Sequence, residues 1–289
     1  MVKKDYNHIG TCAKLCSPKA SQNPMQLTLI SGIFAVLFYL TGLGFQVMNF
    51  MTDKKTRNFV FGFGVLAVLT HSISATSVIR TADGYQFGIV EISTMIALAM
   101  SVLVLVSSLR KPLDTLFLGL FPIAIVTIIA SLTATSTMPP TSLSAGLAAH
   151  VLLSILAYSF ITIAAVQAAF LAYQNHQLRH GHAGGFIRRL PPLQDMETFL
   201  FELVWVGQLL LSLGIIAGLL FVDDIFGRDG VIHKTFFSIL AWMVFAVLLW
   251  GRHQLGWRGN TAIRWTLIGF ALLLVGFYGT KFALEYILA

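Results

Sequence analysis

The amino-acid sequence predicts an all-α, polytopic membrane protein, a bundle of about eight transmembrane helices, and three observations predict this fold class. The chain of 289 residues is 56% hydrophobic and only 11% charged, with a mean hydropathy of +0.80. A soluble domain carries about 25% charged residues. The apolar residues gather in eight runs, each near the roughly 20 residues that a helical span needs. These runs lack the period-two alternation of an outer-membrane-type barrel, which that fold class would require.

The eight runs are taken as spans in chain order because a helix satisfies all of its backbone groups internally, as lipid demands. Polar segments rich in Gly, Pro or charge separate them. The longest interior connection, 175–199, is interrupted by glycines and ends with Pro191 and Pro192, which stiffen it. The expected spans are 26–49, 58–79, 87–109, 113–134, 145–174, 199–222, 235–251 and 264–286.

The net charge of +7 does not indicate a nucleic-acid partner, because the cations follow the predicted topology. By the positive-inside rule the odd connections are cytoplasmic, so both termini lie outside. The stretch 248–265, with three arginines and three tryptophans, is then a cytoplasmic anchor loop, and its arginines would meet anionic lipids. The cations of the odd connections are Lys54, Lys55, Arg57, Arg110, Lys111, Arg179, Arg188, Arg189, Arg252, Arg258 and Arg264.

The first 24 residues do not fit this topology, since their four lysines would favour the cytoplasm and no apolar signal-peptide core is evident. We expect 1–24 to be a disordered N-terminal extension, with Met25 as an alternative start, and 25–289 to form the transmembrane domain. The two cysteines, Cys12 and Cys16, lie in this extension. No second ligand pair accompanies them, which disfavours a metal site there.

Two histidines are the strongest candidates for chemistry, because ionisable residues inside spans are costly. His71 lies about 12 Å from the outer end of the second span and His150 about 8 Å from the outer end of the fifth, at 1.5 Å per residue. Two imidazoles at similar depth could hold a haem iron between helices. The alternative is that each histidine hydrogen-bonds a neighbouring helix.

Enzyme motifs are absent from the sequence. It contains no phosphate-binding G-x-x-x-x-G-K-[ST], no H-E-x-x-H and no G-x-S-x-G. We therefore expect that the chain is not an enzyme. A solute or metal-ion transporter is also disfavoured, because neither broken half-helices nor repeated acidic sites are visible.

Three segments resemble the cytochrome c assembly membrane proteins, a family that includes the CcsA haem-delivery proteins, the HemX proteins and the bacterial YpjD proteins. The first is "FFSILAWMVFAVLLWGRHQLGWRGNTAIRWTLIGFALLLVGFYG" (236–279), with an internal Trp242, a G-W-R-G turn and a final G-F-Y-G. The second is the H-x-x-x-S-x-x-x-Y helix that opens at His150, and the third is the P-L-x-x-M-E segment within 190–221. The chain resembles the YpjD-like branch most.

The resemblance implies a multi-pass protein of the bacterial inner membrane that takes part in cytochrome c-type biogenesis or haem handling. It also implies that His150 is a candidate haem-iron ligand on the outer side, and His71 looks like the histidine in the second span of YpjD-like members. This chain departs from the haem-delivery members, whose W-W-D segment has no counterpart in 222–234 and whose histidine at the end of the seventh span corresponds to Trp250. The chain is therefore not expected to attach haem to apocytochrome c by itself.

We accordingly predict a membrane protein of the cytochrome c assembly type that binds haem b near the outer face, with His71 and His150 as iron ligands. The alternative is a non-haem, HemX-like scaffold or regulator that acts through its cytoplasmic loops. Its partner would be a cytochrome c biogenesis or haem-synthesis protein.

Overall fold

The structure, a computed structural model, describes residues 23–52, 56–109, 114–134, 139–181, 190–221 and 231–279. Within these ranges eight helices are long and apolar enough to cross a membrane, which confirms the predicted fold class. The elements are α1 (Asn23–Thr52), α2 (Arg57–Ile79), β1 (Arg80–Thr81), β2 (Gly84–Tyr85), α3 (Ile89–Ser108), α4 (Asp114–Thr133), α5 (Ala145–Arg179), α6 (Leu193–Phe221), α7 (Val231–Gln254), α8 (Asn260–Leu274) and the π-helix η2 (Val275–Gly279).

Several helices are longer than the apolar runs that predicted them. The helix α6 begins at Leu193 instead of 199, and α7 continues to Gln254 instead of 251. Hydropathy marks only the part of a helix that suits lipid, whereas the backbone hydrogen bonds continue through polar residues beyond it. The connection between α7 and α8 is therefore reduced to residues 255–259.

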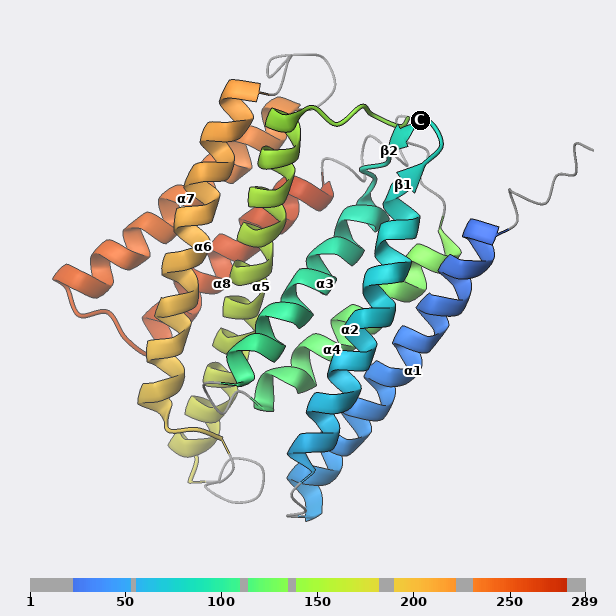
Figure 1. The fold of residues 1–289 in the computed structure, drawn as a ribbon. Coiled ribbons are helices and arrows are strands. Elements are labelled where there is room, and N and C mark those ends of the chain that lie inside the picture. Colours follow the sequence, from blue (N-terminus) through green and yellow to red (C-terminus); the bar gives the residue numbers. More distant parts are fainter. Residues whose placement is uncertain are drawn as a thin grey trace, which may run out of the picture.

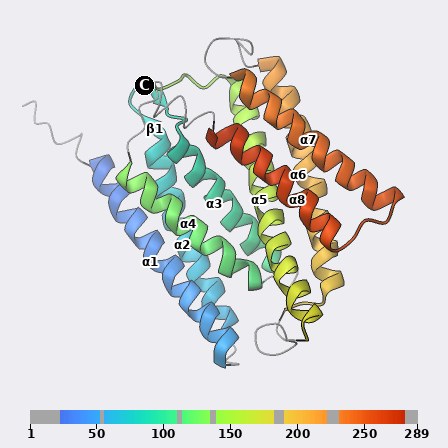
Figure 2. The ribbon, with the colours of Figure 1, turned by 180° about the vertical axis from the view of Figure 1, so that it is seen from behind.

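The eight helices form two groups of four that lie side by side (Figures 1 and 2). In the first group α1 packs on α2 and α4, and α3 packs on the same two helices. In the second group α5 packs on α6 and α8, and α7 packs on the same two. The groups meet where α3 and α4 contact α5. Figure 1 shows α3 between α2 and α5.

The α5–α6 pair has the most extensive contact of any two helices in the described structure, and small residues permit it. A Cβ added to Gly207 on α6 would lie 2.8 Å from Ile161 Cγ1 on α5. Small residues let helix backbones approach closely in membranes, where the hydrophobic effect does not drive association. Large apolar side chains such as Trp205 and Leu220 instead point outward and are 62% and 70% exposed, as a lipid-facing surface requires.

A short hairpin joins the connections at one end of the bundle. Strands β1 and β2 pair antiparallel, with Arg80 opposite Tyr85 and Thr81 opposite Gly84. Tyr85 also exchanges two backbone hydrogen bonds with Thr141, in the segment before α5. This end of the bundle therefore holds the start of α3 and the start of α5 in fixed relation.

Several predictions concern residues outside the described ranges. The extension of residues 1–24 falls there up to residue 22, and so do Cys12 and Cys16. The helix α1 begins at Asn23, before the alternative start at Met25. The acidic segment 222–230, the arginines at 188 and 189, and the last predicted span beyond Gly279 also lie outside the described residues.

Candidate functional site

A cavity of about 290 Å³ lies within the second group of helices, on the side that faces α3. It is lined by side chains from α3, α5, α6, α7 and η2, and most of the lining is apolar. Small-molecule sites measure about 300–1,000 Å³ and combine apolar walls with a few polar groups. This cavity lies near the lower end of that range, and it has the corresponding composition.

His150 is the polar group on the α5 wall of the cavity. Its ring Nδ1 lies 2.8 Å from the carbonyl oxygen of Gly214 on α6, an acceptor only, so Nδ1 carries the hydrogen and donates it. A neutral imidazole then holds its lone pair on Nε2. No hydrogen bond to Nε2 occurs among the described residues. This arrangement, with one ring nitrogen fixed by a backbone carbonyl, is the one that metal-ligating histidines use.

Two glycines of α6 create the space for this imidazole. Gly214 supplies the carbonyl that accepts from Nδ1. Gly218 lies one turn further along, and a Cβ there would come within 2.9 Å of His150 Cε1 and 3.1 Å of Nδ1. Gly218 is therefore needed for the observed ring position, since real Cβ atoms do not approach other atoms so closely.

The H-x-x-x-S-x-x-x-Y pattern places three side chains on one wall of the cavity. His150, Ser154 and Tyr158 follow at intervals of four residues and all line the cavity, as expected for one face of a helix. The Tyr158 hydroxyl donates to the Leu273 carbonyl at 3.1 Å, just before α8 changes into η2. A π-turn frees carbonyl groups from the regular ladder and is frequent at functional sites. Here it brings Phe277 to the cavity wall.

The α7 wall supplies the remaining polar groups, Lys234, Thr235 and Ser238. The Lys234 ammonium lies 5.4 Å from the centroid of the Phe277 ring, within the range of a cation–π contact. Among the residues that the structure describes, no Asp or Glu lines the cavity. The cavity therefore offers a neutral imidazole on one wall and a cation on another.

His71 occupies a different environment, inside the first group of helices. It is completely buried. Its Nδ1 lies 3.3 Å from the Tyr39 hydroxyl of α1, and its Nε2 lies 2.9 Å from the Thr94 hydroxyl of α3. Because each hydroxyl can donate or accept, both ring nitrogens are satisfied in either tautomer. A metal could bind this ring only after one of these bonds had been broken.

The structure does not bring the two predicted ligands together, because α3 lies between them. Thr94 contacts His71, whereas Ile92 and Ile96 of the same helix line the cavity that contains His150. The two histidines thus contact different sides of α3 and do not share one space. Within the described part of the chain, no second His, Met or Cys lines the His150 cavity.

The residues of the cavity fit a haem better than a bare metal ion. The described part of the chain holds no cluster of three or more His, Cys, Asp or Glu side chains that could enclose a metal ion. Haem iron receives its equatorial nitrogens from the porphyrin and needs only axial ligands from the protein. His150 can provide one such ligand beside apolar walls. A ligand as large as haem must extend from this partly open cavity or displace its walls.

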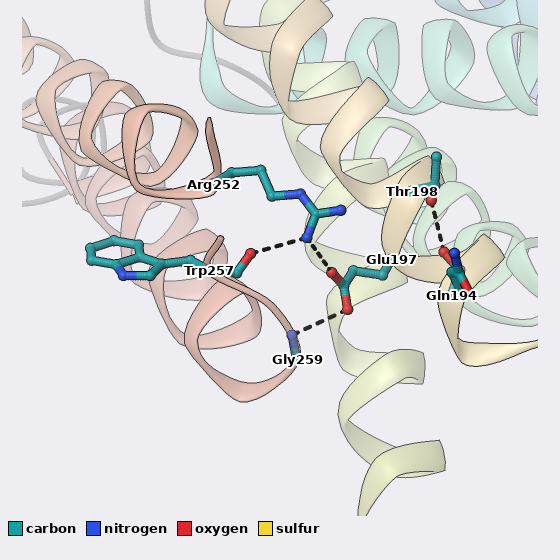
Figure 3. A network of polar contacts seen from close by, with 6 residues as sticks. All are labelled: Gln194, Glu197, Thr198, Arg252, Trp257 and Gly259. Carbon is teal, nitrogen blue, oxygen red and sulfur yellow. Dashed lines mark hydrogen bonds and ion pairs between the residues drawn. The ribbon is translucent and has the colours of Figure 1, made fainter. Parts of the chain in front are cut away.

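A second polar cluster lies at the opposite ends of the helices, where α6 begins and α7 meets α8 (Figure 3). Arg252 donates to Glu197 Oε1 at 2.8 Å, and the backbone N–H of Gly259 donates to Glu197 Oε2 at 3.2 Å. Arg252 also donates to the Trp257 carbonyl at 3.2 Å. Glu197 belongs to the P-L-x-x-M-E segment and Gly259 to the G-W-R-G turn. The two motifs are therefore parts of one contact, which we call the Glu197 latch.

The latch explains most of the unusual composition of residues 248–265. Trp257 packs on Gly251, where any Cβ would collide with the indole, and stacks on Trp265 at 5.4 Å between ring centroids. Gly256 and Gly259 have positive φ values of 64° and 54°, which favour glycine. Trp250 is 58% exposed on the outer surface of the bundle. Tryptophan and glycine here shape a tight turn as well as facing the membrane interface.

Fold and cavity together define a class of protein: a multi-span membrane protein that presents one histidine to a cavity between its helices. The family is shown by sequence comparison. Residues 58–288 match the family described as cytochrome C assembly protein, and the chain belongs to that family. No solved structure matches this sequence.

Three relatives illustrate the range of the family. The chain is 32% identical over 142 residues to the inner membrane protein YpjD of Escherichia coli K12, which covers 49% of this chain and 53% of that protein. It is 24% identical over 131 residues to the protein HemX of Brevibacillus brevis, and the match covers 45% of this chain and 48% of that protein. It is 27% identical over 101 residues to the cytochrome c biogenesis protein CcsA of Gloeobacter violaceus, and the match covers 35% of this chain and 30% of that protein.

The matches to YpjD span about half the length of each of the two proteins. Family membership and the eight spans establish a multi-pass protein of the inner membrane.

Sequence reasoning singled out His150 but missed the groups that define its environment. The one-turn spacing of Gly214 and Gly218 was a usable signal, because small residues at that spacing mark a close helix contact. The acceptor Glu197 had no such signal, since a carboxylate near a helix start is also a common cap. The contacts of Tyr39 and Thr94 with His71 join three different helices, and their partners cannot be inferred from spacing along one chain.

Proposed function

We propose that this chain is an integral inner-membrane protein of the cytochrome c assembly type that binds haem b in the His150 cavity, near the outer face. The observation that carries the proposal is the hydrogen bond from His150 Nδ1 to the Gly214 carbonyl, which leaves Nε2 as a lone-pair donor at an apolar cavity. Bound haem would supply an iron that accepts this lone pair. The names of the cytochrome c biogenesis relatives support the same reading.

The chain's own residues would bind and orient the haem, and we propose that they catalyse no reaction. Gly214 fixes the tautomer of His150, and Gly218 leaves room for its ring. Apolar side chains from α3 and α6 line the same cavity and would contact the apolar ring of the haem. His71 was predicted as the second ligand and stays a prediction. Its two hydrogen bonds support instead a role in joining α1, α2 and α3.

The partners belong to the proposal too. A cytochrome c biogenesis or haem-synthesis protein would act with this chain, and the cytoplasmic arginines would meet anionic lipid headgroups. The alternative function, a HemX-like regulator without haem, needs no vacant ring nitrogen at a cavity. It predicts a colourless protein that does not bind added haemin.

The test is the absorption spectrum of the detergent-purified protein, oxidised and reduced, with and without added haemin. Wild type, His150→Ala and His71→Ala are compared. A single axial histidine predicts a broad five-coordinate spectrum that His150→Ala abolishes and His71→Ala preserves. Imidazole added to His150→Ala should restore part of the binding, because it replaces only the lost ligand.

Two results would contradict this proposal in different ways. Sharp reduced α and β bands that disappear in both variants would establish the bis-histidine site predicted from the sequence, with a rearranged α3. A wild-type protein that neither carries haem nor takes up haemin would exclude haem binding and favour the regulator.

A further inference from the structure

The charges inside the His150 cavity predict the chemistry of its ligand in more detail than the histidine alone does. Among the described side chains that line the cavity, only His150 and Lys234 carry nitrogen, and none is a carboxylate that could neutralise the Lys234 ammonium. A cation inside a membrane-spanning bundle is costly unless an anion pairs with it. The described side chains that line the cavity therefore carry no negative charge to balance the ammonium. A ligand could supply that charge.

The position of Lys234 is held by packing. Its residue lies in the first turn of α7, which starts at Val231. Its ammonium lies 5.4 Å from the centre of the Phe277 ring, and Phe277 is itself part of the cavity wall. A Cβ on Gly276 would lie 3.7 Å from the Lys234 carbonyl and 2.7 Å from Phe237 Cβ, so η2 and α7 are in close contact here. The contact keeps the cation beside the cavity.

His150 and Lys234 enter the cavity from different helices, and apolar side chains such as Ile92, Ile96 and Phe277 complete the wall. The matching ligand has three parts: a centre that accepts a nitrogen lone pair, an apolar body and an acidic group. An iron porphyrin with carboxylate side chains has all three. A neutral apolar molecule or a simple metal ion would leave the His150 imidazole or the Lys234 ammonium without a partner.

We propose that Lys234 pairs with a carboxylate of the porphyrin ligand and so fixes its orientation, an inference that rests on the haem-binding function proposed above. His150 would then hold the iron, and Lys234 in the first turn of α7 would hold the carboxylate. The competing source of an anion is a lipid phosphate, which a lysine near a helix end can reach by extending its side chain. The two sources differ in whether Lys234 affects binding of the porphyrin.

The experiment compares haemin with haemin dimethyl ester, which keeps the iron and the apolar ring but carries no carboxylate. Both are titrated into the purified protein in detergent, and their dissociation constants are read from the Soret band. The proteins are wild type, Lys234→Met, Lys234→Arg and His150→Ala. Lys234→Met keeps the length and apolar stem of the side chain, and Lys234→Arg keeps the charge. Binding of the ester by the two Lys234 variants reports whether their cavity is intact.

We expect Lys234→Met to weaken haemin binding by about tenfold or more, the loss of one charge-assisted hydrogen bond. The same variant should bind the ester as wild type does, and Lys234→Arg should retain most of the haemin affinity. His150→Ala should weaken the binding of both compounds. Equal haemin affinity of wild type and Lys234→Met would overturn the inference, leave the haem-binding function intact and assign Lys234 to lipid phosphate. Failure of wild type to bind either compound would overturn both proposals.

Discussion

At His150 one hydrogen bond decides which ring nitrogen carries the proton and which keeps the lone pair. The Gly214 carbonyl can only accept, so the proton of a neutral imidazole resides on Nδ1 and the lone pair on Nε2. The same imidazole without that carbonyl would distribute between two tautomers. The bond therefore leaves Nε2 of His150 with the lone pair that the proposed haem site needs, whereas His71 has a hydroxyl at each ring nitrogen.

Gly218→Ala should weaken haemin binding by about 10- to 100-fold, the usual effect of disturbing the group that orients a metal ligand. The added Cβ would come within 2.9 Å of His150 Cε1, so the ring must turn away and lose its bond to Gly214. The measurement is a haemin titration of the purified variant.

The matched control is Gly214→Ala, one turn away on the same helix. Its Cβ would meet the Ser154 hydroxyl at 3.6 Å, an ordinary contact, and its carbonyl remains as acceptor. It should bind haemin nearly as wild type does. Equal losses in the two variants would show that α6 tolerates no methyl group here and would remove the special role of Gly218.

Tyr39→Phe should lower the free energy of unfolding by about 0.6–1.7 kcal/mol, the range of interhelical hydrogen bonds in membrane proteins. It removes only the hydroxyl that bonds His71 Nδ1. His71→Ala should cost more, because it also leaves a cavity and frees the Thr94 hydroxyl. Unfolding by SDS in mixed micelles measures both.

Neither change should alter a haem spectrum, since neither side chain lines the His150 cavity. Thr41→Val serves as a control on α1, because the Thr41 hydroxyl bonds only within its own helix and is exposed. A His71→Ala protein that unfolds like wild type but loses its haem would return His71 to the role of ligand.

At the scale of elements, the Glu197 latch organises the end of the bundle away from the cavity. One carboxylate receives hydrogen bonds from a side chain of α7 and from the backbone just before α8 (Figure 3). Arg252 also stacks over the Phe201 ring of α6, at 4.6 Å from the guanidinium carbon to the ring centroid. Three helices thus share one partly buried charge pair, whose side chains are 27% and 15% exposed.

A double-mutant cycle with Glu197→Gln and Arg252→Met should give a coupling energy of about 1 kcal/mol, reduced from that of a buried pair by solvent screening. Each single variant should also speed proteolytic cleavage in the turn 255–259, because Glu197→Gln weakens the acceptor of the Gly259 N–H and Arg252→Met removes the donor to the Trp257 carbonyl. Cleavage rates are followed by electrophoresis after limited chymotrypsin treatment, because the aromatic target Trp257 lies in the turn and is unchanged in every variant.

Arg258→Ala is the control for this turn, since Arg258 is exposed and lies in the same G-W-R-G sequence. It removes a cation without touching the latch. If Arg258→Ala destabilised the turn as strongly as Arg252→Met does, general charge would matter there more than the specific pair.

At the scale of the whole molecule, the two groups of four helices separate two kinds of polar interior. The first group encloses the hydrogen bonds of His71, and the second encloses the cavity of His150. The helix α3 belongs to the first group and also forms one wall of the second group's cavity. A shift of α3 would therefore act on both interiors at once.

The predicted orientation can be tested because residues 25–289 contain no cysteine. In a Cys12→Ser, Cys16→Ser background, Leu255→Cys in the α7–α8 turn should be cytoplasmic and shielded from a membrane-impermeant maleimide added to spheroplasts. Ser142→Cys, in the connection before α5, should react. Both positions are exposed, so permeabilised cells should label both. The reverse pattern in spheroplasts would invert the topology and place the cavity near the cytoplasmic face.

The sequence by itself determined the number of spans and the all-α class, and it predicted His150 as a candidate ligand inside a span. These follow from local properties: helices in lipid need long apolar runs, and a histidine inside one is exceptional. The resemblance to the cytochrome c assembly family was likewise carried by contiguous segments, and the family match confirmed it.

Only the tertiary structure decided which helices face one another. Equal depth made His71 and His150 look like partners, yet α3 lies between them and provides Thr94 to one and cavity wall to the other. The Glu197 latch and the position of Lys234 depend likewise on contacts between helices distant along the chain. Hydropathy records the depth of a residue in the membrane but not its direction around the helix axis relative to other helices. That direction is set by close packing at residues such as Gly207 and Gly218.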